Sequence, residues 1–136
     1  MSNVEQTLSI IKPDAVERNL ENEIKEIFKS KGFKIVKDKK IQIEKAEAEK
    51  FYKVHETKPF YNDLCEYLSS GPIVVMILEK VNAVIGNRDL MGATNPEDAK
   101  DGTIRKKYGI SIDKNSVHGS DSIENAKIEI EFFFKD

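Results

Sequence analysis

The stretch IVVMILEK, residues 73–80, is the most continuous apolar run in the chain. It follows Gly71-Pro72, a pair that ends the segment before it. Continuous apolar runs of this length are typical of strands whose two faces are both covered by other parts of the protein. We therefore expect residues 73–80 to form a central strand of a sheet.

Two further segments have the pattern of strands. TLSIIKP, residues 7–13, is a short β-rich run that stops at Pro13, which cannot donate a hydrogen bond to a ladder. In FKIVKDKKIQI, residues 33–43, apolar and polar residues alternate in two pieces, a pattern that favours one long or bent strand. We expect this second strand to pair antiparallel with the first.

Apolar residues at helical spacing predict helices in the segments between and after these strands. Asp14 is expected to cap a turn after Pro13. Gly32 is expected to end the helix that precedes it, and Ser122 is expected to cap the last helix. The predicted helical segments are 20–31, 44–56, 59–70, 81–91 and 122–134. Residues 91–109 read as a loop, and the pieces 110–112 and 116–119 read as short extended segments.

The order of these elements is typical of an α+β sandwich, an antiparallel sheet with helices packed on one face. A chain of 136 residues with 39% hydrophobic residues is long enough for one compact core and short for two domains of ordinary size. We expect residues 1–136 to form a single domain.

Composition argues against several classes of partner. The 22 basic and 24 acidic residues nearly cancel at a formal charge of −2, so neither specific nucleic-acid binding nor an anionic membrane surface is expected. Cys65 is the only cysteine, which excludes an intramolecular disulfide and a thiolate metal cluster. No apolar stretch is long enough to cross a bilayer, and MSNVEQ does not read as a signal peptide. A soluble cytoplasmic protein is expected.

NSVHGSD, residues 115–121, contains one of only two histidines. His118 is a candidate base, metal ligand or nucleophile, although a lone histidine is more often structural. Metal binding is the weakest option because no HxH, HExxH or cysteine partner accompanies it. A nucleophilic imidazole needs a group that holds its tautomer, and Glu129 or Asp121, bridged by Ser120, are the candidates.

The common phosphate-binding loops, GxxxxGK[ST] and GxGxxG, are absent from the sequence. Lys12, Arg88 and Arg105 lie where side chains from separate segments can converge on an anion. Taken singly, each is expected to be a solvated surface charge. The default assignment of His55, Tyr52, Phe60 and Cys65 is structural packing. The residues alone thus indicate an α+β domain with a candidate anion site around one histidine.

Five segments together resemble the successive signatures of the nucleoside diphosphate kinase family, in order and over residues 7–134. They are IIKPDAV, FYKVHETKPFYNDL, SGPIVVMILE, GNRDLMGATNPEDAKDGTIR and NSVHGSDS. The resemblance implies a ferredoxin-like βαββαβ core. It also implies an enzyme that moves the γ-phosphate of a nucleoside triphosphate, typically ATP, to a nucleoside diphosphate by a ping-pong mechanism through a phosphohistidine. A catalytically silent nucleotide-binding or signalling module is the alternative.

The resemblance also implies roles for individual residues. His118 would be the nucleophile, attacking through its δ nitrogen, with Glu129 and Ser120 orienting the ring. The implied phosphate clamp consists of Lys12, Arg88, Thr94 and Arg105, and Tyr52 would approach the transferring phosphate. Asn115 with Lys12 would bind the ribose 3′-hydroxyl. Phe60, Leu64 and Ile112 would form the base slot. Mg²⁺ would arrive on the nucleotide, bound mainly by phosphate oxygens and water. Stacking implies broad base tolerance.

Some positions depart from the family pattern. Lys58 stands where arginine is common, Leu78 where tryptophan is frequent, and Asn22 where glycine is common. An ammonium at Lys58 cannot reproduce the guanidinium fork. The chain stops at Asp136 without the longer C-terminal segment of eukaryotic members, which contributes to subunit contacts in the family. A homo-tetramer and a homo-hexamer both remain open.

Overall fold

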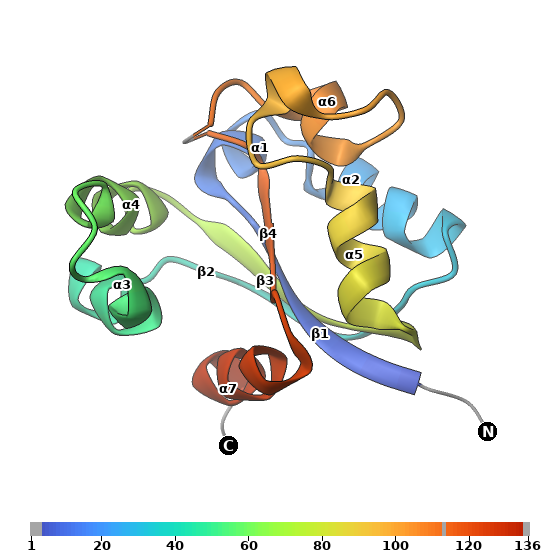
Figure 1. Ribbon diagram of the computed structural model, residues 1–136, viewed down its shortest axis with the longest axis horizontal. Coiled ribbons are helices and arrows are strands. Elements are labelled where there is room, and N and C mark those ends of the chain that lie inside the picture. Colours follow the sequence, from blue (N-terminus) through green and yellow to red (C-terminus); the bar gives the residue numbers. More distant parts are fainter. Residues whose placement is uncertain (1–3, 113, 135–136) are drawn as a thin grey trace.

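The computed structural model describes residues 4–112 and 114–134 (Figure 1). Four strands in this part of the chain form one antiparallel sheet with the order β2-β3-β1-β4. They are β1 (Val4–Ile11), β2 (Lys34–Ile41), β3 (Ile73–Val81) and β4 (Val117–Gly119). Within residues 4–112 and 114–134, seven α-helices and two short 3₁₀ helices connect and cover the strands: α1 (Pro13–Glu17), α2 (Glu21–Ser30), α3 (Lys45–Phe51), η1 (Lys53–His55), α4 (Tyr61–Leu68), α5 (Ala83–Met91), η2 (Pro96–Asp98), α6 (Ile104–Tyr108) and α7 (Ile123–Phe134).

The apolar run occupies the centre of the sheet, as predicted. β3 is buried from Ile73 through Leu78 and lies between β2 and β1. The predicted pairing of the second strand with the first is therefore wrong, because β2 pairs with β3, from Lys34 opposite Glu79 to Ile41 opposite Ile73. The strand that is apolar on both sides takes the inner place, and the lysine-rich β2 stays at the edge, where its side chains remain hydrated.

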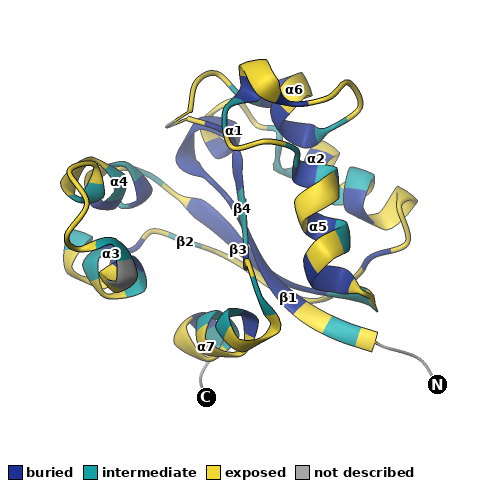
Figure 2. Ribbon diagram, in the orientation of Figure 1, coloured by how far each residue is buried: buried dark blue, intermediate teal, exposed yellow. Residues whose placement is uncertain are grey.

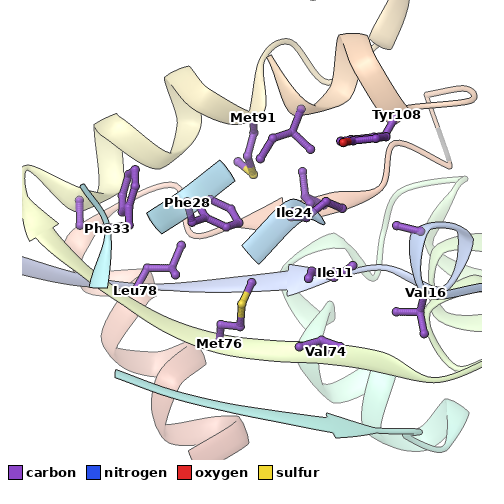
Figure 3. Close-up of a cluster of buried hydrophobic side chains, with 14 residues drawn as sticks. Ile11, Val16, Ile24, Phe28, Phe33, Val74, Met76, Leu78, Met91 and Tyr108 are labelled. Atoms are coloured by element: carbon purple, nitrogen blue, oxygen red, sulfur yellow. The ribbon is translucent and has the colours of Figure 1, made fainter. Parts of the chain in front are cut away.

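Helices cover both faces of this sheet, which corrects the expectation of one covered face (Figures 1 and 2). Side chains alternate along β3, so neighbouring residues enter different cores. Val74, Met76 and Leu78 pack with residues of α2 and α5 in one core (Figure 3). Ile73 and Val75 pack against α3, α4 and α7 in the other. The resulting architecture is the predicted ferredoxin-like α+β sandwich.

Two of the predicted helix ends are confirmed. Gly32 follows α2 with a φ of 89°, a conformation that glycine adopts without a Cβ clash. Ser122 accepts a hydrogen bond from the backbone N–H of Asn125 at 3.1 Å at the start of α7.

Other local predictions need correction. The segment 91–109 contains η2 and α6, and residues 110–112 form no strand. Asp14 lies inside α1 rather than capping it, since Lys12 is the residue that precedes the helix. Pro13 starts α1 with its φ already set for a helix, which explains why β1 stops just before it.

Candidate functional site

β4 places His118 opposite Ile10 of β1, on the face of the sheet that α7 covers. The Nε2 atom of His118 lies 3.1 Å from Oε1 of Glu129 on α7. The hydroxyl of Ser120 donates to the same carboxylate oxygen at 2.8 Å. Of the two candidate carboxylates, Glu129 therefore contacts the ring, while Asp121 accepts a hydrogen bond from the side chain of Asn125.

Several contacts fix the orientation of the imidazole. The hydroxyl of Ser120 also accepts a hydrogen bond from the backbone N–H of Leu8 at 3.3 Å, which ties the histidine–glutamate pair to β1. The ring of Phe51 meets that of His118 edge-on, with centroids 5.3 Å apart. The histidine side chain is 22% exposed, and no group in residues 4–112 or 114–134 hydrogen-bonds its Nδ1. With Nε2 held by Glu129, Nδ1 is the nitrogen that can meet a reactant.

Lys12 and Asn115 join the end of β1 to the segment before β4. The Nζ of Lys12 donates to Oδ1 of Asn115 at 2.9 Å, and the Asn115 amide donates to the carbonyl of Thr94 at 3.0 Å. Lys12 is only 6% exposed. The interpretation of Lys12 as a solvated surface charge is therefore wrong, since a cation this buried needs polar partners.

Arg105 of α6 is likewise buried, at 9% exposure, so the surface interpretation fails for it as well. Its guanidinium donates to the carbonyls of Gly92 at 3.0 Å and Val117 at 2.9 Å. Its Nε is buried with no hydrogen-bond partner in the described part of the chain. Burial, followed by the charge of Arg88, lowers the pKa of Arg105 to about 10, so the side chain still carries its charge at neutral pH.

A surface depression of about 630 Å³ collects part of the predicted phosphate clamp. Arg88, Thr94 and Arg105 line it, together with Asp98, Lys100 and Thr103. Arg88 is exposed on α5, as expected for a solvated charge, and Thr94 is exposed as well. Two guanidinium groups that repel each other beside one depression favour an anion between them.

A series of aromatic rings leads from the histidine to the predicted base slot. Phe51 contacts Tyr52 at a centroid distance of 5.0 Å, Tyr52 contacts His55 at 6.3 Å, and His55 contacts Phe60 at 6.0 Å. Tyr52 is buried, and burial raises the pKa of its phenol. His55 packs between rings, in agreement with its structural interpretation. Phe60 is 44% exposed, so its expected place in the core is wrong.

The base slot itself stays a prediction. Ile112 is 54% exposed, and Leu64 is partly buried against the core that contains Tyr52. Phe60 lies just before the first residue of α4, where its ring remains open to solvent. A phenylalanine ring exposed in this way is suited to stacking.

Sequence reasoning missed two residues of the site. Phe51 holds the histidine ring edge-on, and Asn87 of α5 lies fully buried against Gly119, the residue after His118. Phe51 precedes Tyr52 in the predicted helix, so the sequence contained a weak indication that Phe51 lies beside the site. Asn87 had none, because the packing of α5 on β4 is a long-range contact.

We expect the substitution Gly119→Ala to destabilise the protein. A Cβ at this position would collide with the amide of Asn87 and lie 2.8 Å from Cε of Met91. Overpacking of this kind should lower the free energy of unfolding in urea by about 2 kcal/mol. Asn87→Ala in the same chain should restore much of the loss, because it removes the collision and two unpaired polar groups. Equal stability of the single and double variants would contradict this account.

Stability should fall at alkaline pH. Burial raises the pKa of all four tyrosines, which are Tyr52, Tyr61, Tyr67 and Tyr108. A phenol whose pKa is raised in the fold contributes stability that is present below its unfolded pKa of 10.0 and is lost as the pH rises above it. Urea unfolding at about pH 8 and about pH 11 should show this loss, and Tyr52→Phe should make it smaller. An equally steep loss in the variant would contradict the burial of that phenol.

The fold and the site define a class: a ferredoxin-like α+β protein with a carboxylate-bound histidine and a surface depression lined by Arg88 and Arg105. The family model for nucleoside diphosphate kinase matches residues 5–136. The chain belongs to the nucleoside diphosphate kinase family, a family of phosphotransferase enzymes.

Individual relatives agree with this assignment over nearly their whole length. A nucleoside diphosphate kinase of Campylobacter jejuni is 60% identical over 97% of this chain and 96% of its own, and one of Persephonella marina is 56% identical over 96% and 94%. The crystal structure of the Aquifex aeolicus nucleoside diphosphate kinase matches with a TM-score of 0.95 at 39% identity, covering 97% of this chain and 96% of that one. The enzyme from Encephalitozoon cuniculi matches with a TM-score of 0.93 at 38% identity, covering 97% and 90%.

Two further observations concern membranes and metals. Within the described residues, no helix combines the length and the apolar character that a membrane span requires. In the same residues, no three histidine, cysteine, aspartate or glutamate side chains converge as a set of metal ligands.

Proposed function

We propose that the protein, as a single domain over residues 1–136, transfers the γ-phosphate of a nucleoside triphosphate to a nucleoside diphosphate through a phosphohistidine at His118. The observation that supports this most is the contact of Nε2 with Glu129 at 3.1 Å. In the neutral ring, a proton on Nε2 is donated to the carboxylate, and the lone pair of Nδ1 is left available for attack. Ser120 holds the carboxylate in turn, at 2.8 Å.

The two half-reactions balance without a co-reactant. Nδ1 forms a bond to the γ-phosphorus while the bond from that phosphorus to the β-phosphate oxygen breaks, and the nucleoside diphosphate leaves. A terminal phosphate oxygen of a second nucleoside diphosphate then attacks the phosphorus, and the N–P bond breaks. One site serves donor and acceptor in turn, which is the basis of ping-pong kinetics.

Positive charge around the transferred group is the second requirement, because phosphoryl transfer depends mainly on alignment and charge neutralisation. Lys12, Arg88 and Arg105 would supply it, with Thr94 as a neutral donor and the buried Tyr52 next to the transferring phosphate. Lys12 and Arg105 are held by hydrogen bonds to Asn115, Gly92 and Val117. Groups held in place in this way need little reorganisation when the substrate binds.

Magnesium would enter as part of the nucleotide substrate. Phosphate oxygens and water are the ligands that Mg²⁺ usually keeps in nucleotide complexes. The protein's own contribution would then be the cationic side chains that hold the same phosphates. At the nucleoside end, Asn115 and Lys12 would bind the ribose 3′-hydroxyl, and Phe60, Leu64 and Ile112 would hold the base.

Labelling of the wild-type protein tests this function. Incubation with MgATP labelled in the γ position should yield one acid-labile phosphate per chain, which added GDP should remove as labelled GTP. A catalytically silent nucleotide-binding module would instead bind ATP and GDP without producing GTP. A folded, nucleotide-binding protein that takes up no label would defeat the proposal.

The active protein would be an assembly of identical chains, a tetramer or a hexamer. The edge strand β2 and the exposed Val36 on it offer unpaired backbone and apolar surface, which supports self-association. Light scattering should give a mass four or six times the chain's 15.5 kDa. A monomeric mass at micromolar concentration would contradict this part of the proposal.

A further inference from the structure

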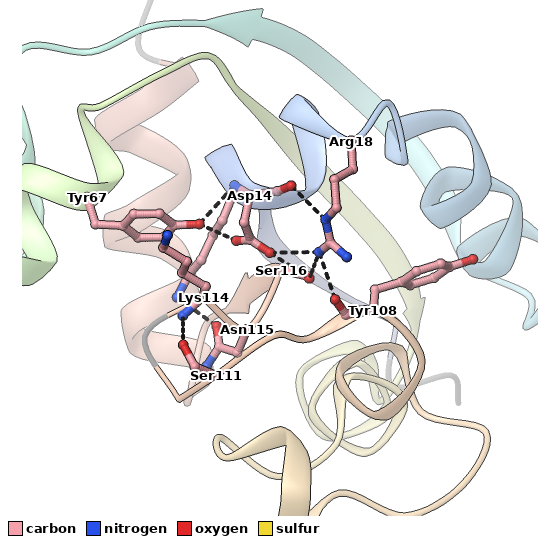
Figure 4. Close-up of polar contacts among 9 residues, drawn as sticks. Asp14, Arg18, Tyr67, Tyr108, Ser111, Lys114, Asn115 and Ser116 are labelled. Atoms are coloured by element: carbon pink, nitrogen blue, oxygen red, sulfur yellow. Dashed lines mark hydrogen bonds and ion pairs between the residues drawn. The ribbon is translucent and has the colours of Figure 1, made fainter.

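A buried polar network lies beside the proposed nucleotide site and has no role in the mechanism above. Its centre is the carboxylate of Asp14, whose side chain is 3% exposed (Figure 4). Oδ2 accepts hydrogen bonds from Arg18 at 3.0 Å and from the hydroxyl of Ser116 at 2.9 Å. Oδ1 accepts a hydrogen bond from the phenol of Tyr67. Both oxygens are therefore satisfied, as a buried carboxylate requires.

The partners of Asp14 come from segments that are distant in sequence. Tyr67 belongs to α4, and its oxygen also accepts the backbone N–H of Asp14 at 2.8 Å. Arg18 reaches from the end of α1 to the carbonyl of Tyr108 in α6 at 2.7 Å. Ser116 lies directly before β4. The network thus joins the two helices next to the predicted clamp and base slot to the strand that carries His118.

Ser116 has a backbone conformation that needs support. Its φ is 73°, in the left-handed region, and the backbone N–H of Val117 donates to the carbonyl of Asn115 at 2.9 Å across it. A three-residue turn of this kind is strained for a residue other than glycine. Such conformations persist only where neighbouring contacts hold them. At Ser116 the hydroxyl donates to Asp14 and accepts from Arg18 at 3.2 Å. Its carbonyl accepts the backbone N–H of Lys12 at 2.8 Å.

The turn sets the positions of two proposed nucleotide-binding side chains. Asn115 precedes Ser116, and its Oδ1 accepts the hydrogen bond from the Nζ of Lys12 at 2.9 Å. The carbonyl of Ser116 also accepts the backbone N–H of Lys12. Ser116 therefore holds the backbone of Lys12 through a hydrogen bond and the backbone of Asn115 through the peptide bond between them. Relaxation of the turn would therefore move Asn115 relative to Lys12, and both relative to His118 two residues further on.

We propose that the hydrogen bond from Ser116 to Asp14 is a positioning element, which holds the strained turn so that Asn115 and Lys12 together meet the ribose 3′-hydroxyl. This inference rests on the proposed function, because it concerns the same nucleotide site. Neither Asp14 nor Ser116 touches the substrate. The role of the pair is to place two groups that do.

The test compares GDP with 3′-deoxy-GDP as phosphate acceptors from ATP. We expect Ser116→Ala to reduce the ratio of kcat/KM for GDP to that for 3′-deoxy-GDP by about 10-fold, because a misplaced Asn115–Lys12 pair loses most where the hydroxyl is present. Ser116→Gly should recover most of the wild-type ratio. Glycine adopts the left-handed turn without strain, so the turn no longer depends on the missing hydroxyl.

Tyr67→Phe is the matched control. It also removes one hydroxyl from the carboxylate of Asp14, but on the side of α4, and leaves the bond from Ser116 in place. Its ratio should stay within about twofold of wild type, even where its melting temperature falls as far as that of Ser116→Ala. An unchanged ratio in Ser116→Ala, a reduction in Ser116→Gly as large as that in Ser116→Ala, or an equal reduction in Tyr67→Phe would overturn the inference.

The same design separates the inference from the proposed function. A wild-type protein that makes no GTP would defeat the proposed function. The ratio compared is then the affinity for GDP over the affinity for 3′-deoxy-GDP, each taken as the reciprocal of the equilibrium dissociation constant. The same reduction is expected in Ser116→Ala, with the same control. A wild-type protein that makes GTP while its ratio is unaffected by Ser116→Ala would defeat the positioning role alone.

Discussion

His118→Asn should abolish the formation of GTP from ATP and GDP, with kcat lower by at least about 1,000-fold. An asparagine amide has no lone pair on nitrogen that can attack phosphorus, so the covalent route is closed rather than slowed. The measurement is the initial rate of GTP formation, together with acid-labile label on the chain after incubation with MgATP. The label should be absent.

The other histidine supplies the control for this experiment. His55 packs between the rings of Tyr52 and Phe60 and is partly buried, which resembles the setting of His118 in aromatic contact. In the described part of the chain, no carboxylate contacts its ring to fix the tautomer. His55→Asn should keep the label and retain activity within about threefold. Label that survives in His118→Asn would place the phosphate on another residue and refute the proposed nucleophile.

Arg105→Ala should reduce both activity and stability. Its guanidinium holds the carbonyls of Gly92 and Val117, and a truncated side chain leaves both without a donor. Hydrogen bonds from a charged group to buried acceptors contribute about 1.5–3 kcal/mol each, so we expect a loss of about 3 kcal/mol in the free energy of unfolding. Loss of a clamp cation should also lower kcat/KM by at least about 100-fold.

Lys106→Ala is the matched control, since it removes a neighbouring exposed cation from the same helix. It should change the unfolding free energy by less than about 0.5 kcal/mol and leave kcat/KM near the wild-type value. Urea unfolding and steady-state kinetics on the same preparations check both parts. An Arg105→Ala protein as stable and as active as Lys106→Ala would show that the buried guanidinium has neither role.

Much of the fold was readable from local pattern. The apolar run at residues 73–80, the stop at Pro13 and the glycine after α2 all act through neighbouring residues, and each appears where it was predicted. Strand order was not readable in the same way. β2 pairs with β3 across more than thirty residues; the apolar and lysine-rich patterns indicate an inner and an edge place but do not specify the pairing partner.

The candidate site likewise has features that were visible in the sequence and features that only the structure showed. The segment around His118 and the spaced basic residues were visible in sequence, and the family resemblance named their roles. The burial of Lys12 and Arg105 was not visible, because a basic residue in isolation is usually hydrated. Nor was the choice between Glu129 and Asp121, which depends on how α7 crosses β1 and β4.

Residue order along the chain was thus sufficient for most of the helices, for the buried central strand and for His118 as a candidate, since the first two follow from periodicity and the third from the family resemblance. The three-dimensional arrangement was needed for the partner of His118, the buried cations and the strained turn at Ser116. Those features arise from contacts between segments up to about a hundred residues apart, as between Ser116 and Asp14, and only the packing of both sheet faces brings such segments together.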